Sequence, residues 1–342
     1  MEICGCIHLH TKFSDGGADY DTLIKAAEGA GLDYICVTDH MTLEGKNREG
    51  FYGPLFVLVG YEHNDENNRN HYIAFGTPET AGSLTDPQEY INRVKEMGGI
   101  GFLSHPAEKR RHINETFRSY PWTAWNAQGF DGIEIWNQLS DWMEQLRGWR
   151  AVTKLLRPNR LIRNAPQDLL HKWDEMNRNR FVSAIGVADA HSGKFSFGPF
   201  GYLTKYELRG IRTHFFVDQA DWSDEKKTGG ALIAAMRDGK GFISNYCTGD
   251  AKGCKIILRD NSDNVEYPGV PTNNLKLPMM MEVSLTEKAE IRLIRNGEVV
   301  QSATNTAAEW TITETGVYRV EAYKQNRAWI YSNPFPVGRY PL

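Results

Sequence analysis

Residues 3–16 read ICGCIHLHTKFSDG, an apolar run followed by His8, His10 and the acid Asp15. The run ICGCI predicts a buried strand. His8 and His10 are two residues apart, so both imidazoles lie on one face where this strand ends. Two polar side chains at a strand exit fit plain hydrogen bonding as well as metal binding. The stretch leaves both interpretations open, and the other strand ends decide between them.

Six further apolar runs alternate with helix-like segments up to about residue 250. The runs are YICVT (34–38), LFVLVGY (55–61), YIAFG (72–76), GIGFL (99–103), GIEIW (132–136) and FVSAIGV (181–187). Amphipathic segments at 21–31 and 87–99 end in glycine, as helices often do. This alternation predicts an α/β fold with a largely parallel sheet or barrel, in which side chains at the carboxyl ends of strands gather at one rim.

The pattern changes after about residue 255. The segment AEIRLIRNGEVVQSA (289–303) places an Asn-Gly turn between two strand-like halves, which is a strong hairpin signal. Aromatic and β-branched residues then alternate over 315–337. We therefore predict a first domain over residues 1–254 and a small antiparallel β-sandwich domain over 255–342. The segment 106–175 is rich in Trp, Arg and Asn, and we interpret it as excursions that shape a pocket.

The composition is that of an ordinary globular protein. The 342 residues are 41% hydrophobic and 24% charged, with a mean hydropathy of −0.50. A net charge of −4 argues against a general binder of nucleic acid or membrane surfaces, so the expected partner is a small-molecule substrate. The sequence has no long apolar span, no secretory signal and only five cysteines, from which we expect a cytoplasmic location. It does not indicate the oligomeric state.

Imidazoles and carboxylates stand at or near the ends of several predicted strands. There are nine of them: His8, His10, Asp15, His40, Glu62, His71, His105, Asp189 and His191. Gathered at one rim without a partner, the carboxylates would repel one another, and each unpaired buried group would cost about 1–3 kcal/mol. Divalent metals relieve that conflict and accept this mixture of nitrogen and oxygen ligands. The pattern therefore predicts a metal centre, in which a carboxylate such as Glu62 can bridge two ions about 3.5–4 Å apart with a hydroxide between them.

The ordered motifs HLHT, SDG, AAEGAGLDYICVTDH, GYE, HYIAFG, SHP and ADAH resemble the PHP (polymerase and histidinol phosphatase) family of metal-dependent hydrolases over roughly residues 3–245. The resemblance implies a distorted (β/α)7 barrel with two or three divalent ions, zinc, manganese or iron, at the carboxyl ends of its strands. The tail segments GVYRVEAY and WIYSNPFPV resemble the small β domain of carbaryl-hydrolase-like metallohydrolases.

The resemblance also implies how the nine side chains are shared among the ions. One ion would take His8, His10, Glu62 and Asp189. A second would share Glu62 and take His71 and His105. A third would take Asp15, His40 and His191. Some relatives have histidine in place of Asp15, and a carboxylate there suits manganese or iron alongside zinc.

The expected chemistry is hydrolysis by a hydroxide that bridges two ions and is held by Glu62. The leading prediction is a metal-dependent phosphoesterase acting on a small phosphomonoester such as a nucleotide, with His191 or Asp15 as the candidate acid. One alternative is a metallohydrolase of carboxylic esters or carbamates, suggested by the C-terminal β domain. Another is a non-catalytic, metal-stabilised scaffold.

Four further residues are candidates for binding the substrate. Lys109, Arg110 and Arg111 in HPAEKRRH predict either a phosphate clamp or a solvated basic turn. Asn137, which follows Glu134 in IEIWN, either contacts the substrate or forms a hydrogen bond to a metal ligand.

Overall fold

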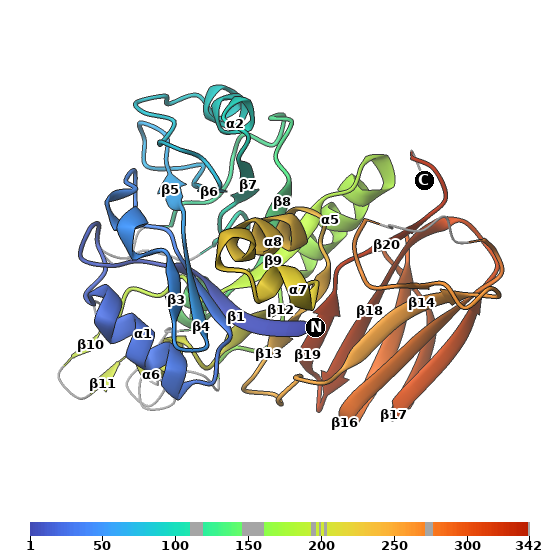
Figure 1. Cartoon of the computed structure of the whole chain (residues 1–342). Helices are drawn as coiled ribbons and strands as arrows, with labels where there is room; N and C mark the ends of the chain where they lie inside the picture. The colour runs from blue at the N-terminus through green and yellow to red at the C-terminus, as the bar shows by residue number, and fades with distance from the viewer. Residues whose placement is uncertain are drawn as a thin grey trace.

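The predicted apolar runs form buried strands in the computed structural model, which describes residues 1–109, 119–145, 161–192, 196–197, 200–201, 204–270 and 276–340. These strands are β1 (Glu2–Leu9), β2 (Tyr34–Val37), β4 (Leu55–Val59), β5 (Tyr61–His63), β6 (Tyr72–Phe75), β7 (Ile100–Leu103), β8 (Gly132–Asn137) and β9 (Ser183–Val187). Two short pieces accompany them, β3 (Gly50–Tyr52) and the ribbon of β10 (Ser196–Phe197) and β11 (Phe200–Gly201). The result is a mixed α/β structure (Figure 1).

Both helices expected from the amphipathic segments are present. Helix α1 (Tyr20–Gly29) begins where the Asp19 side chain accepts a hydrogen bond from the Thr22 amide. Helix α2 (Pro87–Glu96) is capped in the same way by Asp86, with proline at its first position. The other helical elements are the 3-10 helix η1 (Glu44–Arg48), α3 (Gln138–Gln145), α5 (Gln167–Asn179), α6 (Thr204–Glu207), α7 (Gln219–Trp222) and α8 (Glu225–Arg237). None of the described helices has the length and apolar character needed to span a bilayer.

The strands are only partly parallel, which corrects the expectation of a largely parallel arrangement. β1, β2 and β4 pair in parallel, as do β7, β8 and β9. β6, however, runs antiparallel to both β5 and β7. An antiparallel strand begins at the edge where its neighbours end. His71, immediately before β6, is thereby placed beside the carboxyl end of β7, and its carbonyl accepts a hydrogen bond from the Ser104 amide at 3.0 Å.

Backbone hydrogen bonds also join the two main sheets at both ends of this strand series. The Glu62 amide donates to the Asp39 carbonyl at 3.2 Å and the Met41 amide donates to the Glu62 carbonyl at 2.9 Å, which connects the chain after β2 to β5. The His10 amide donates to the Ala190 carbonyl at 2.9 Å, which connects the end of β1 to the end of β9. The α/β class is confirmed. With few helices and two separate sheets, the (β/α)7 barrel stays a prediction.

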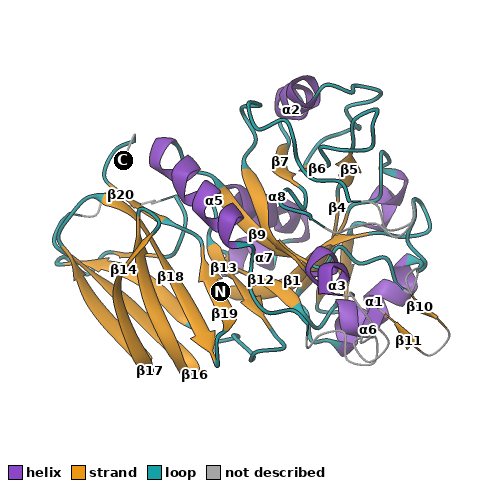
Figure 2. Ribbon diagram, turned by 180° about the vertical axis from the view of Figure 1, so that it is seen from behind, coloured by secondary structure: helices purple, strands orange, loops and turns teal. Residues whose placement is uncertain are grey.

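The C-terminal region consists of antiparallel strands, as expected. They are β14 (Lys255–Asp260), β15 (Val265–Glu266), β16 (Met279–Arg295), β17 (Glu298–Ile312), β18 (Gly316–Lys324), β19 (Arg327–Ser332) and β20 (Phe335–Val337). Asn296 and Gly297 form the predicted hairpin turn with φ angles of 53° and 90°. β19 pairs with β13 (Gly241–Asn245), which pairs with β12 (Ile211–Phe216) and through it with β1. The two regions share one continuous sheet (Figure 2), so the division between residues 254 and 255 stays a prediction.

A buried ion pair ties α5 to the C-terminal strands. Arg319 of β18 is 3% exposed and donates to both carboxylate oxygens of Asp174 on α5, at 2.7 and 2.8 Å. It also pairs with Glu321 on its own strand. Removing one partner from a buried ion pair leaves uncompensated charge and is strongly destabilising.

We expect Arg319→Met to lower the free energy of unfolding by about 3–5 kcal/mol, because it leaves Asp174 and Glu321 buried without a cation. Arg295→Met is the matched control, since Arg295 pairs with the exposed Glu314 and its loss should cost less than about 1 kcal/mol. Urea unfolding of both variants measures the difference. Equal losses would contradict a stabilising role for the buried pair.

A second buried polar cluster lies where β1, β12 and β13 meet. The His214 ring donates from Nδ1 to Glu2 at 2.7 Å, while its Nε2 lies 2.9 Å from the Ser244 hydroxyl and 3.4 Å from the Cys4 sulfur. Burial opposes charging of this ring. Cys4 and Glu2 outweigh burial and raise the pKa of His214 to about 9.

This raised pKa predicts a pH-dependent contribution to stability. An unfolded histidine titrates near pH 6.5, so the contribution is complete below about pH 6.5 and is lost as the pH rises through 9, by roughly 3 kcal/mol in total. Urea midpoints of metal-free protein at pH 6 and above 9, compared between the wild type and His214→Gln, isolate it. An identical pH dependence in both proteins would show that His214 does not carry it.

Candidate metal centre

All nine predicted ligand residues come together at one edge of the strands. His8 and His10 come from the end of β1, His40 follows β2, Glu62 is in β5, and His71 precedes β6. His105 follows β7, while Asp189 and His191 follow β9. Asp15 comes from the loop after β1 and is 38% exposed, and His40 is 24% exposed, so these two residues mark the open side of the cluster.

The carboxylate of Glu62 is the centre of the cluster. It is 1% exposed, and its two oxygens face five imidazoles. Oε1 lies 2.9 Å from Nδ1 of His71 and 3.2 Å from Nε2 of His105. Oε2 lies 3.1 Å from His8, 3.4 Å from His10 and 3.4 Å from His40. Because each oxygen serves a different set of histidines, Glu62 has the geometry of a bridging ligand.

Asp189 and Asp15 complete the ring on either side of His10. Oδ1 of Asp189 lies 3.5 Å from His8 and 3.6 Å from both His10 and His191. Oδ1 of Asp15 lies 3.4 Å from His191 and 3.7 Å from both His10 and His40. These separations are longer than hydrogen bonds but suit atoms that ligate a common ion.

The backbone is strained where three strands deliver their ligands. His8, His105 and Asp189 have φ angles of 67°, 32° and 52°, in the left-handed region that side chains with a Cβ avoid. Such conformations cost on the order of 1–3 kcal/mol each and cluster at functional sites. The strain indicates that the surrounding structure holds these three side chains in place for their chemistry rather than for local stability.

Glu134, at the end of β8, positions two of the histidines. It is 1% exposed, and its Oε1 accepts from Nδ1 of His8 at 2.6 Å while its Oε2 accepts from the His105 amide at 2.6 Å. Asn137 donates from Nδ2 to both Glu134 and Asp189 at 3.1 Å. Of the two roles left open for Asn137, this geometry favours orienting metal ligands over contacting the substrate.

Two acids that sequence reasoning missed shape the loops of the cluster. Asp39 accepts from the Thr11 amide, the Thr11 hydroxyl and the Ser14 hydroxyl, all within 2.7 Å, and so folds the loop that carries Asp15. Glu207 accepts from the His191 amide at 2.9 Å and from the Ser192 amide. The only sequence signal for Asp39 is its place directly before His40. Glu207 has no sequence signal, because it lies in α6, far along the chain from the motifs of the cluster.

The electrostatics match a cluster that awaits cations. Burial alone would raise the pKa of Glu62, but His8, His71 and His40 hold it well below its usual range. The same balance, with His8 as the main opposing group, lowers the pKa of Asp189. Burial lowers the pKa of His40 to about 3, so its ring is neutral near pH 7. Burial opposes charging of His8, His105 and His191, but nearby carboxylates outweigh it and raise the pKa of His8 and His191, and that of His105 to about 9. Because metals bind ionised carboxylates and neutral imidazoles, metal binding would displace protons from these three rings.

His10 provides the test of whether a metal fits. Its ring is fully buried, and within the described part of the chain neither ring nitrogen makes a hydrogen bond. A buried imidazole without partners costs free energy, whereas ligation would satisfy it. Three sets of side chains have ligand atoms within 4.8 Å of one another: His10, Asp15, His40 and His191; His8, His10 and Glu62; and His40, Glu62 and His71. The donor set therefore fits divalent ions.

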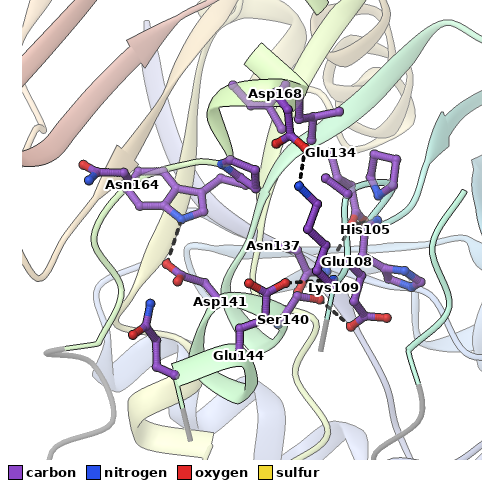
Figure 3. A pocket seen from close by; sticks show the side chains of 17 residues that line it. His105, Glu108, Lys109, Glu134, Asn137, Ser140, Asp141, Glu144, Asn164 and Asp168 are labelled. Atoms are coloured by element: carbon purple, nitrogen blue, oxygen red, sulfur yellow. Dashed lines mark hydrogen bonds and ion pairs between the residues drawn. The ribbon is translucent and has the colours of Figure 1, made fainter. Parts of the chain in front are cut away.

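A cavity of about 290 Å³ opens beside the cluster (Figure 3) and shares His105, Glu134 and Asn137 with it. Lys109 lies in its wall, 62% exposed, and its ammonium pairs with Asp168. Because its ammonium is paired, the structure does not support the expected role of Lys109 as a phosphate clamp. Arg110 and Arg111 lie outside the described residues, so their predicted roles stay open.

Residues 7–102, which carry six of the nine cluster residues, match the sequence model of the PHP domain. This segment of the chain is similar to the PHP domain. An uncharacterized protein of Methanocaldococcus jannaschii, MJ1587, is 27% identical over 115 residues, a match that spans 29% of this chain and 66% of that protein. The motif resemblance noted in the sequence is thereby confirmed for the PHP segment.

Two solved structures match this one only weakly. A two-domain protein of Bacteroides vulgatus containing a predicted PHP-like metal-dependent phosphoesterase is 12% identical, with a TM-score of 0.48 over 98% of this chain and 95% of that chain. A candidate metal-dependent phosphoesterase of Bifidobacterium adolescentis is 16% identical, with a TM-score of 0.34 over 59% of this chain and 94% of that one.

We expect Glu134→Gln to lower the affinity for the bound metals by about 10–100-fold, because the amide cannot hold both His8 and the His105 backbone as the carboxylate does. Competition with a chelator of known affinity, followed by metal analysis, measures the change. Glu282→Gln is the control, since Glu282 pairs with Arg259 in the C-terminal sheet. Unchanged affinity in Glu134→Gln would contradict its positioning role.

Proposed function

We propose that this protein is a metal-dependent phosphoesterase that hydrolyses a small phosphomonoester. The observation that carries the proposal is the buried Glu62 carboxylate, shared by five imidazoles within 3.4 Å in the segment that matches the PHP domain. A carboxylate in that position suits two adjacent metal ions, the arrangement that phosphoryl-transfer sites commonly use. The match to the PHP domain supports metal-dependent hydrolysis in general. The phosphomonoester substrate is our own proposal.

The nine side chains would hold the metals in overlapping groups. His8, His10, Glu62 and Asp189 form the first group, Glu62 with His71 and His105 the second, and Asp15 with His40 and His191 the third. The mixture of imidazole and carboxylate ligands suits zinc, manganese or iron. When bound, such ions lower the pKa of a coordinated water to about 7 and neutralise negative charge on a reacting phosphoryl group.

The protein's own residues set the orientation of this machinery. Glu134 holds the His8 ring with a 2.6 Å hydrogen bond, and Asn137 fixes Asp189 at 3.1 Å. His191 donates from Nδ1 to the Asp189 carbonyl at 3.0 Å while its Nε2 faces Asp15 at 3.4 Å. With both nitrogens engaged, His191 is better suited to ligation than to protonating a leaving group.

The adjoining cavity is the natural place for the leaving group of the substrate. Its volume of about 290 Å³ accommodates a small organic group, and Ile135, Trp136 and Leu169 supply apolar wall. Its polar lining includes the carboxylates of Glu108, Asp141, Glu144 and Asp168, with Lys109 the one cation among the lining residues described. Like charges repel at this range, so the lining favours an uncharged or hydroxyl-bearing group over one with a second phosphate.

We also infer that the strands around the site close into the barrel that the family resemblance implies. The hydrogen bonds from Glu62 to Asp39 and from His10 to Ala190 support a ring in the order β1, β2, β4 with β5, β6, β7, β8 and β9. In such a ring every ligand-bearing strand would be held by a neighbour on each side.

Phosphate release from a panel of phosphomonoesters by manganese- or zinc-loaded protein tests the proposal. We expect turnover that a chelator abolishes, that added metal restores, and that Glu62→Gln lowers by more than about 100-fold, because the amide removes the shared negative charge. Glu282→Gln should retain full activity. Activity that persists in Glu62→Gln at the wild-type level would reveal a contaminating phosphatase, which neither substitution affects.

Absence of phosphate release from metal-loaded wild type would overturn the phosphoesterase assignment. Hydrolysis of an aryl carbamate or carboxylic ester by the same protein would then favour the alternative metallohydrolase. Metal removal that lowers the unfolding temperature while no substrate class turns over would favour the scaffold.

A further inference from the structure

Strand β17 is the outermost strand of the large sheet along its whole length. Its fifteen residues, Glu298–Ile312, pair with β16 on one side. Of the strands that the structure describes, none pairs with its other side. Figure 1 shows β17 at the end of the molecule farthest from β5 and β6. Glu62 of the metal cluster is in β5, and His71 directly precedes β6. The free edge presents a row of backbone amides and carbonyls to solvent.

The other edge elements of this sheet are protected by being short. The sheet path ends at β15, which has two residues, and at β3, which has three. β20, which lies off the path beside β18, also has three residues and includes Pro336. Short edge strands and prolines are ways in which proteins prevent edge-to-edge pairing. β17 is several times longer than these elements, so length does not protect it.

The pairing of β17 with β16 is irregular at Val300 and between Asn305 and Ala307, but β17 lacks two other protective devices. The ten residues between Glu298 and Glu309, VVQSATNTAA, contain no charged residue and no proline. Most of them are exposed, and the neighbours Val299 and Val300 are 55% and 42% exposed. Val299 faces Ile294, and Val300 is an extra residue before the pair of Gln301 and Leu293, so two exposed apolar side chains stand at the hairpin end. An uncharged edge of this length is otherwise a site of uncontrolled association.

We propose that the β17 edge pairs with the β17 edge of a second copy of this chain, so that the protein is a two-fold symmetric dimer with one sheet running through both copies. The inference is independent of the proposed function, because it concerns a surface remote from the metal cluster.

Self-pairing is favoured because an antiparallel strand is its own complement about a two-fold axis. With the axis at Thr304, residues 299–309 of one copy face residues 309–299 of the other. Glu298 and Glu309 then lie opposite Trp310 and Val299 rather than opposite each other, so no like charges meet. A regular pairing of all eleven residues would give about ten backbone hydrogen bonds, the number found in a typical protein interface, and the irregularities at Val300 and between Asn305 and Ala307 lower that number.

The pairing closes after two copies. Among the strands that the structure describes, each chain offers one such edge, so the contact uses up both of these edges and leaves none for a third copy. Both metal clusters stay open to solvent at opposite ends of the dimer. The expected product is a discrete dimer and not a fibre.

Light scattering after size-exclusion chromatography, over a wide range of protein concentration, tests the proposal. We expect wild type to reach twice its chain mass of 38.8 kDa. Thr304→Lys places two ammonium groups at the two-fold axis and should give monomers, and Val300→Lys should do the same by charging the edge. Ser284→Lys is the matched control, an exposed position on β16 that is already paired on both sides, and should remain dimeric.

Circular dichroism and metal content verify that each lysine variant is folded. Thr304 faces Glu290 across the hairpin, so a lysine there has an acid beside it in the monomer. A wild type that is monomeric at every concentration would overturn the proposal. So would a dimer that persists in both edge variants, or assemblies that grow beyond two copies.

Discussion

The constraint on which this structure depends is the burial of one carboxylate, Glu62, among five imidazoles. Each of these groups prefers water unless a partner of opposite charge replaces it, and burial withdraws the water. The protein meets the cost with a surrounding layer of fixed acceptors and donors: Glu134, Asn137, Asp39 and Glu207 each hold a ligand or its loop. The left-handed backbone at His8, His105 and Asp189 is a further free-energy cost of placing these side chains in the cluster.

Strand direction is what makes the cluster compact. Parallel strands bring their carboxyl ends to one edge, which gathers residues from β1, β2 and β9. His71 would lie at the opposite edge if β6 were parallel, because it precedes its strand. The reversal of β6 places it 2.9 Å from Glu62 instead. A local departure from regular α/β order thus serves the site directly.

The C-terminal strands support the strand that carries Asp189. Asn333 accepts from the Ala184 amide at 2.7 Å and donates to the Ala184 carbonyl at 2.9 Å, so it fixes β9 from outside. Arg319 holds Asp174 of α5 from the same side, and β19 extends the sheet from β13. These contacts give the C-terminal region a structural role for the metal cluster, whatever the substrate.

The sequence alone determined most of the buried strands of the first region and named the nine side chains that gather in the cluster. The apolar runs, the two amphipathic helix segments and the Asn296–Gly297 turn depend on a few neighbouring residues, and they appear where the sequence predicts them. The nine cluster residues could be named because each stands near a strand end and all are ligand types. Only the tertiary structure decided the reversal of β6, the sheet shared by the two regions, and the roles of Asp39 and Glu207. These features depend on pairings between residues far apart in the chain, whose register is set by which faces become buried together. No local pattern encodes that choice, because the free energy that decides it arises only when the strands meet.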